Sequence, residues 1–188
     1  MTHYRNGTYV AFAADGGEDI IKSDIKYYNL LKAWKESEHK EFTFVNSHEK
    51  KAIREKSKDI TIENTLKLRL KKSNLFILLV GDTTALDDDF VPLEIEYAID
   101  VCKLPVVVCY VNHRDRIVKS LPWDLQKLLP DTLQNRIDSE AVKTIHIPYR
   151  EHIIHHSVDL YSFSSPPPYT MTGFKDWVYE KYYDKNKI

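Results

Sequence analysis

Short apolar runs, separated by longer amphipathic stretches, dominate the hydrophobic pattern of this chain. The runs at 76–80 and 106–109 are apolar without alternation, which indicates strands covered on both faces. Strands are expected near 8–13, 42–45, 75–80, 104–110 and 143–147. Apolar residues at helical spacing fill the intervals, at about 24–38, 62–73 and 90–102. The alternation of strand and helix predicts an α/β protein with a doubly wound, parallel, five-stranded sheet and helices on both faces.

The pattern loosens after residue 112. Two short helices are expected at 121–129 and 131–138, and the strand at 143–147 is a candidate sheet edge. Three consecutive prolines, Pro166–Pro168, precede a tail whose spacing predicts an amphipathic helix, packed through Phe174, Trp177 and Val178. We therefore assign 1–150 to one α/β domain and 151–188 to a proline-containing linker and a C-terminal helix that packs on it.

Composition narrows the class of protein and its partners. A chain of 188 residues suits one domain with a sizeable core, and its net charge of −1 gives no long-range field for nucleic acid. No apolar run approaches the roughly 18–20 residues that span a bilayer, and the N-terminus lacks the apolar segment of a signal peptide. The two cysteines lie in apolar surroundings and are expected to be reduced. We expect a cytoplasmic protein with neither nucleic acid nor membrane as partner.

Glu94 stands out in the helix that follows the strand at 75–80. On a wheel of about 100° per residue, one apolar stripe is formed by Val91, Ile95, Ala98, Ile99 and Cys102. Glu94 falls on the shoulder of this stripe and is expected to be half-buried, whereas Glu96 falls outside it. A carboxylate at the mouth of a parallel sheet is well placed for chemistry and costly to bury without a partner. Two interpretations stay open: a functional carboxylate, or a helix-terminal one satisfied by nearby backbone or by Arg69.

Other polar residues follow the predicted strands and should meet Glu94 at one edge of the sheet. They are Asp15, Asn46, Ser47, His48, Asp82, Thr83 and Thr84. This set suits a polar small molecule with hydroxyl groups, and neither of the glycine-rich phosphate-binding motifs is present. Asp87–Asp89 is interpreted as a helix N-cap. His152, His155 and His156 lack matching ligands and are interpreted as a surface cluster, so no metal is expected.

The order and spacing of four motifs resemble the TIR fold, in particular the bacterial TIR-like sensor proteins of Thoeris anti-phage defence (ThsB-type). The motifs are Tyr9-Val-Ala-Phe12, Asn46-Ser-His-Glu49, Leu66-x-x-Arg69-Leu70-x-x-Ser73 and Phe90-Val-x-x-Glu94-Ile95. The resemblance covers about 8–112 and continues more weakly to about 149. It implies a flavodoxin-like sheet.

The same resemblance assigns a role to Glu94. In catalytic TIR domains the glutamate of the last motif is essential for cleaving NAD⁺, and it corresponds to Glu94. The substrate contacts expected with it are Phe12, Ala13, Asp15, Asn46, Ser47, His48, Asp82 and Thr83. Phe90 replaces the usual tryptophan, and the loop Ala13–Asp15 also departs from many relatives. NAD⁺ is then the substrate, and no cofactor is expected.

The implied activity is that of an NAD⁺ glycohydrolase, or of an ADP-ribosyl cyclase or transferase. Nicotinamide leaves as a neutral group, so a carboxylate that stabilises the oxocarbenium-like ribose suffices. The product would be an ADP-ribose-derived nucleotide that signals to a separate effector protein, with self-association and a phage-derived trigger implied by the family. Two alternatives remain: a non-catalytic TIR adaptor or self-association module, and a nucleoside deoxyribosyltransferase-like enzyme.

Overall fold

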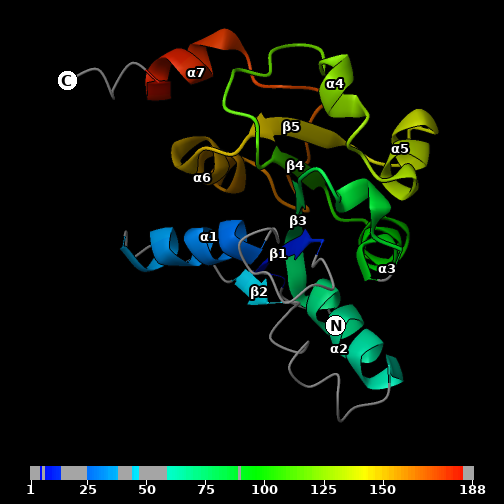
Figure 1. Ribbon diagram of the computed structural model, residues 1–188. Coiled ribbons are helices and arrows are strands. Elements are labelled where there is room, and N and C mark those ends of the chain that lie inside the picture. Colours follow the sequence, from blue (N-terminus) through cyan, green and yellow to red (C-terminus); the bar gives the residue numbers. More distant parts are fainter. Residues whose placement is uncertain are drawn as a thin grey trace.

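The computed structural model describes residues 5, 7–13, 25–37, 44–46, 59–88 and 90–183. Its strands are β1 (Gly7–Phe12), β2 (Phe44–Asn46), β3 (Ser73–Val80), β4 (Val106–Tyr110) and β5 (Thr144–Pro148). They pair in parallel in the order β2-β1-β3-β4-β5, which is the flavodoxin-like order (Figure 1). The predicted parallel α/β sheet is confirmed. Of the strand expected at 42–45, residues 44 and 45 lie in β2, which continues to Asn46, and residues 42 and 43 lie outside the described residues.

Helices cover both faces of the sheet, as predicted (Figure 1). Because successive strand residues point to opposite faces, β3 sends Leu75, Ile77 and Leu79 to one side and Phe76, Leu78 and Val80 to the other. The first side is covered by α1 (Ile25–Ser37), α6 (Glu151–Leu160) and α7 (Asp176–Tyr183). The second side is covered by α2 (Asp59–Lys72), α3 (Phe90–Glu96), the π-helical turn η3 (Tyr97–Val101), α4 (Trp123–Gln126) and α5 (Asp131–Asp138).

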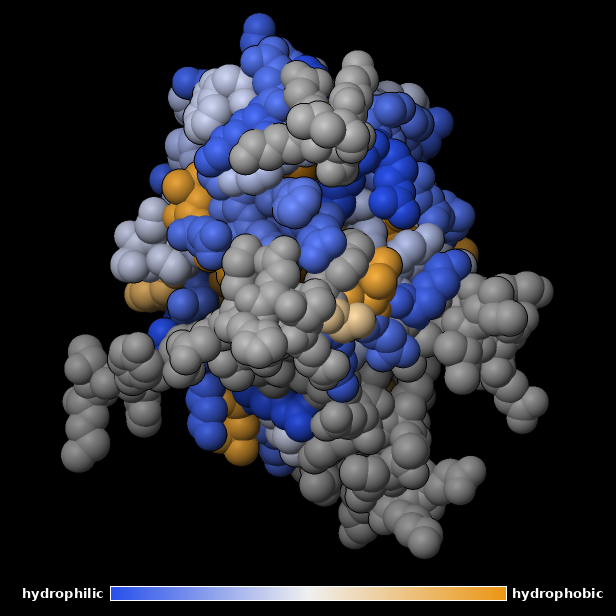
Figure 2. Space-filling model, turned by 90° about the vertical axis from the view of Figure 1, so that its left-hand side faces the viewer, coloured by the Kyte–Doolittle hydropathy of each residue, from blue (hydrophilic) through white to orange (hydrophobic). Residues whose placement is uncertain are grey.

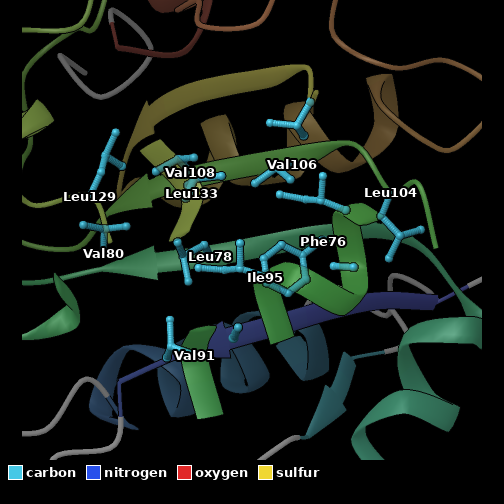
Figure 3. Close-up of a cluster of buried hydrophobic side chains, with 14 of the residues drawn as sticks. Phe76, Leu78, Val80, Val91, Ile95, Leu104, Val106, Val108, Leu129 and Leu133 are labelled. Carbon is cyan, nitrogen blue, oxygen red and sulfur yellow. The ribbon is translucent and has the colours of Figure 1, made fainter. Parts of the chain in front are cut away.

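The apolar stripe predicted after β3 is fully buried. Ile95 of α3 lies against Phe76 and Leu78 of β3, and Val91 belongs to the same buried cluster (Figure 3). Burying each such side chain contributes about 1.5–3 kcal/mol, so these contacts fix the rotation of α3 about its axis. The helix continues through η3, where the Cys102 N–H donates to the Tyr97 carbonyl at 3.0 Å. The span predicted as 90–102 is confirmed, and only its π-helical end was not predicted.

The C-terminal region differs most from expectation. Residues assigned to a linker form α6, whose Ile153 and Ile154 are buried. The last helix begins only at Asp176, and the prediction that Trp177 packs inward is wrong, since its side chain is 56% exposed. The residues of α7 that face the core are Val178 and Tyr179. Each residue of a helix is rotated by about 100° from the one before it, so Trp177 points away from the core when these two point toward it.

The outer edge of β5 is covered by the segment 169–172. The Thr144 and His146 N–H groups donate to the carbonyls of Tyr169 (3.2 Å) and Thr172 (2.7 Å), so β5 does not present open backbone. Gly173 follows directly, and a Cβ at this position would lie 2.1 Å from the Ile117 carbonyl oxygen. The segment therefore requires glycine there to approach the loop after β4.

Surface and cysteine chemistry are unexceptional. Cys102 and Cys109 are both buried and free, as predicted. On the face shown in Figure 2, hydrophobic residues form small separate patches among hydrophilic ones. No helix in the described part of the chain is long and apolar enough to cross a membrane.

Candidate functional site

The connections of β1 and β3 locate a crevice in the sheet. These strands are neighbours, yet α1, which follows β1, packs on one face and α3, which follows β3, packs on the other. Helices that leave adjacent strands toward opposite faces open a crevice at the carboxyl ends of those strands, where α/β proteins bind ligands. Ala13 and Gly81 begin the two loops at this point. The candidate site therefore lies at the β1/β3 edge.

The loop that leaves β3 is closed by its own polar groups. The Gly81 N–H donates to Thr84 Oγ1 at 2.8 Å, and the Leu86 N–H donates to the Thr83 carbonyl at 2.9 Å. Asp87 Oδ1 accepts the Val91 N–H at 3.4 Å, which satisfies a free donor at the start of α3. Asp87 thus has the capping role that was one interpretation of Glu94, and the capping prediction for Asp87–Asp89 is met at Asp87. Asp89 lies outside the described residues.

Glu94 is more deeply buried than its place on the helical wheel predicts. It is 1% exposed, and Tyr9 donates its hydroxyl proton to Glu94 Oε1 at 2.5 Å. The other oxygen, Oε2, is buried and has no hydrogen-bond partner among the residues described here. Nor does any described contact join Glu94 to Arg69, whose Nη1 is itself buried without a hydrogen-bond partner. A buried acceptor left open in this way is rare and calls for a ligand or another explanation.

The environment of Glu94 favours its protonated form. The pKa of the carboxyl is raised from 4.5 to about 8, chiefly because the group is buried; the Tyr9 hydrogen bond lowers the pKa and the negative charge of Asp87 raises it, and both effects are smaller than that of burial. Without ligand, Glu94 is therefore mostly neutral at pH 7. Perturbed pKa values of this kind are typical of functional sites in clefts.

Sequence reasoning missed the role of Tyr9. Its place in an apolar strand was predicted, but nothing in the local pattern connects it with a carboxylate 85 positions away. The Tyr9 ring is fully buried and lies parallel to that of Phe76, with centroids 5.8 Å apart. Only the pairing of β1 with β3, which carries the loop into α3, brings the hydroxyl to Glu94.

The other predicted substrate contacts fall into three groups. Ala13, Asp82 and Thr83 lie at the carboxyl ends of β1 and β3, as expected, and Asp82 is exposed. The Phe12 ring is buried against Tyr28 of α1, on the sheet face opposite to Glu94, so only its backbone is available at this edge. Asn46 ends β2 beside Val10 in the strand register. The contacts at Asp15, Ser47 and His48 concern positions outside the described residues.

A hydrogen-bonded network joins the rim of this edge. Asn112, just after β4, donates through Nδ2 to Asp82 Oδ2 at 3.1 Å and accepts the Tyr27 hydroxyl proton at 2.8 Å. Tyr149, after β5, donates to the Tyr27 carbonyl at 2.5 Å. The sequence placed Asn112 in a loop at this edge but gave no reason to connect it with Tyr27. These contacts hold Asp82 in place beside the candidate site.

A second buried polar cluster lies on the same sheet face as Glu94. His146 contacts the Tyr110 hydroxyl through Nδ1 and Thr144 Oγ1 through Nε2, both at 2.9 Å. The single hydroxyl proton of Thr144 is donated to the Thr170 carbonyl, so Oγ1 must accept from His146 Nε2–H. His146 Nδ1 then accepts the Tyr110 proton, which defines a neutral Nε2–H tautomer. Burial agrees with this, since it lowers the pKa of His146 to about 3.

Two of the three histidines of α6 contact α7, and the third is buried. His152 and His156 face the Tyr182 ring, with centroids 6.1 and 5.4 Å from it. His155 is only 6% exposed, so its assignment to a surface cluster is wrong. In the described ranges no three His, Cys, Asp or Glu side chains gather as a metal site would require.

Comparison with protein families places this geometry in context. The family model of the Thoeris protein ThsB, TIR-like domain, matches residues 9–116, more than half of the chain. The matched region runs from β1 to just beyond β4 and contains both Tyr9 and Glu94. This chain therefore belongs to the Thoeris ThsB TIR-like domain family.

Proposed function

We propose that this protein is a TIR-type enzyme that breaks the nicotinamide–ribose bond of NAD⁺, with Glu94 as the catalytic carboxylate. The observation that carries the proposal is Oε2 of Glu94, which is buried without a hydrogen-bond partner among the described residues, in the helix that follows β3. A ribose hydroxyl that donates to Oε2 would satisfy this oxygen and bring the anomeric carbon next to the carboxylate. Membership in the Thoeris family supports a role in anti-phage defence.

The reaction needs little beyond this carboxylate. As the bond between C1 of ribose and nicotinamide breaks, the electron pair leaves with the nicotinamide nitrogen, which becomes neutral, and positive charge develops on the ribose. Ionised Glu94 stabilises that charge in surroundings that contain little water, where one such interaction is typically worth about 10²–10³ in rate. The ribosyl centre is then taken by a nucleophile, which yields the proposed ADP-ribose-derived signal for a separate effector.

Binding of the substrate should change the protonation state of Glu94. The carboxyl is mostly neutral in the unliganded protein because burial raises its pKa to about 8. The cationic nicotinamide-ribosyl group of bound NAD⁺ would lower that pKa, because an opposite charge nearby favours the ionised form. Glu94 would thus acquire its charge when the substrate that needs it is bound.

One observation favours a second candidate, the non-catalytic TIR adaptor. Glu94 is 1% exposed, so substrate must displace part of its surroundings to reach it. In an adaptor, the Tyr9–Glu94 contact would only join β1 to α3. Nicotinamide release distinguishes the two functions.

The test compares Glu94→Gln with Glu96→Gln in nicotinamide release from NAD⁺, under conditions in which the wild type is active. Glu94→Gln keeps the shape of the side chain and removes its charge, so we expect a loss of about 10²–10³ in kcat/KM. Glu96 is exposed on the same helix, 3.7 Å from Arg136, and its variant should stay close to wild type. Equal activity of Glu94→Gln and wild type would leave the adaptor. Release of base from deoxynucleosides in place of NAD⁺ would favour the transferase.

A further inference from the structure

We infer that Tyr9 is a positioning residue for the reaction at Glu94, holding Oε1 so that Oε2 is the oxygen that meets the substrate. The inference rests on the proposed function and adds a second residue to it. Its basis is the 2.5 Å contact from the Tyr9 hydroxyl to Oε1, together with the open, buried Oε2 of the same carboxyl group. A glutamate side chain has three rotatable bonds, and a fixed donor on one oxygen selects one arrangement among them.

Tyr9 is itself held rigidly enough to act in this way. It lies in β1, which pairs with β2 on one side and β3 on the other. Its ring is fully buried and stacked on Phe76. The orientation of the donor is therefore fixed when the sheet folds, before any substrate arrives. Support of this kind from a central strand is what keeps a reacting group in productive geometry.

Tyr9 is also the described group that favours the ionised form of Glu94. The elements packed against α3 are β1, α2, α5 and η3. Charged side chains on the three helical elements include Glu63, Lys67, Arg69, Lys71, Arg136 and Asp100. Of these, Arg136 is bound to Asp100, and Lys67 and Lys71 lie at the Tyr97 ring. Among the described residues, Tyr9 and Asp87 act on the pKa of Glu94 besides burial, and Asp87 raises it.

The experiment compares Tyr9→Phe with Tyr110→Phe. Both remove one hydroxyl from a buried tyrosine on the same sheet face, but the Tyr110 hydroxyl contacts His146. Two quantities are measured on the full chain: the titration midpoint of Glu94 by carboxyl ¹³C NMR, and the pH profile of kcat/KM for nicotinamide release. The profile reports the free enzyme, so its acidic limb in the wild type should coincide with the Glu94 midpoint.

Removing the Tyr9 hydroxyl should raise the Glu94 midpoint by about one to two pH units, because a hydrogen bond to a charged group is worth about that much. The acidic limb of kcat/KM should move by the same amount, which gives at least about a tenfold loss at a fixed pH below the limb and recovery at higher pH. Tyr110→Phe should lower thermal stability and leave both the midpoint and the limb in place.

An unchanged Glu94 midpoint in Tyr9→Phe would overturn the inference, and so would a loss of activity equal at every pH. If Tyr9→Phe does not fold, 3-fluorotyrosine at position 9 replaces it. This isosteric, more acidic donor should move both the midpoint and the limb downward, and no movement would overturn the inference. If the activated wild type cleaves no NAD⁺, the proposed function fails and the inference falls with it. If the wild type is active but the acidic limb of the kcat/KM profile does not move in the Tyr9 variant, the inference about Tyr9 fails and the proposed function stands.

Discussion

Two tyrosines on one face of the sheet hold two titratable side chains, with opposite results. Tyr110 of β4 donates to His146, whose second nitrogen bonds Thr144, which in turn donates to the Thr170 carbonyl. Tyr9 of β1 donates to Glu94, whose second oxygen has no hydrogen-bond partner in the part of the chain that the structure describes. Burial is nearly complete in both cases. The His146 cluster thus has all its hydrogen bonds made, whereas the Glu94 cluster leaves one carboxyl oxygen without a partner among the described residues.

The two clusters also respond to pH in opposite directions. The folded pKa of Glu94 is raised from 4.5 to about 8, so the folded state binds the extra proton and stability falls as pH rises through that interval. The pKa of His146 is lowered from 6.5 to about 3, so the unfolded state binds the proton first and stability falls as pH decreases through that interval. Where the intervals overlap, the two effects cancel. The contributions of these groups therefore favour greatest stability in mildly acidic solution.

The largest expected effect on stability comes from replacing Glu94, the carboxyl group of the Glu94 cluster. At pH 9 the wild type holds an ionised, buried Glu94, and Glu94→Gln removes this charge. We expect the variant to be more stable than wild type by on the order of 4–5 kcal/mol at pH 9, and nearly equal to it at pH 4. Urea unfolding at both pH values measures the difference. Glu96→Gln, on the exposed side of α3, should change stability by less than about 0.5 kcal/mol. Equal stabilities of Glu94→Gln and wild type at pH 9 would contradict the pKa assigned to Glu94.

A smaller effect is expected when the His146 cluster is disturbed from outside. In Gly173→Ala the new Cβ would meet the Ile117 carbonyl oxygen, at 2.1 Å without relaxation, and must displace the segment that bonds Thr144 and His146. We expect a loss of about 3 kcal/mol, measured by thermal unfolding. Lys175→Ala, at an exposed position two residues on, is the control. The Glu94 titration midpoint should not move in Gly173→Ala, and movement would show that the clusters are coupled.

The smallest expected effect on stability comes from removing one hydrogen bond of the His146 cluster, that between Thr144 and His146. Thr144→Val removes the acceptor for His146 Nε2–H and should cost about 1–3 kcal/mol. Thr144→Ser keeps the hydroxyl and should recover most of that loss. In the wild type, ¹⁵N shifts of the His146 ring should report the Nε2–H tautomer. A protonated Nδ1 would contradict the direction assigned to the chain of hydrogen bonds. Wild-type activity in Thr144→Val would confirm that this cluster serves only the fold.

The elements set by local periodicity were predicted well. The unalternating runs at 76–80 and 106–109 fall in β3 and β4, both fully covered, and α5 occupies 131–138 as expected. The stripe through Val91 and Ile95 is buried, and Glu94 lies on the predicted side of its helix. Each of these depends on residues within a few positions of one another, and the hydrophobic pattern records such relations directly.

Longer-range features escaped prediction for a common reason. The segment 169–172 covers the edge of β5, and α6 stands where a linker was expected. Trp177 points outward because Val178 and Tyr179 are the residues of α7 that pack into the core. The sequence of the five-residue strand β5 did not indicate that His146 would be buried and hydrogen-bonded to Tyr110 and Thr144. Each outcome depends on which surface a distant element leaves uncovered, and the local hydrophobic pattern carries no information about that surface.

Local periodicity was enough to predict most of the strands and helices and the face of α3 that carries Glu94, and the motifs were enough to predict the family. The group that Glu94 contacts depends on how distant elements pack together. A carboxyl group at the border of an apolar stripe can cap a helix, form an ion pair or remain partly without hydrogen bonds. Which of these occurs depends on the side chains of the strand that packs against it. The order β2-β1-β3 places the Tyr9 hydroxyl against Glu94. Because desolvation and a single donor then act on the same carboxyl group, its charge and its open oxygen are properties of the assembled sheet.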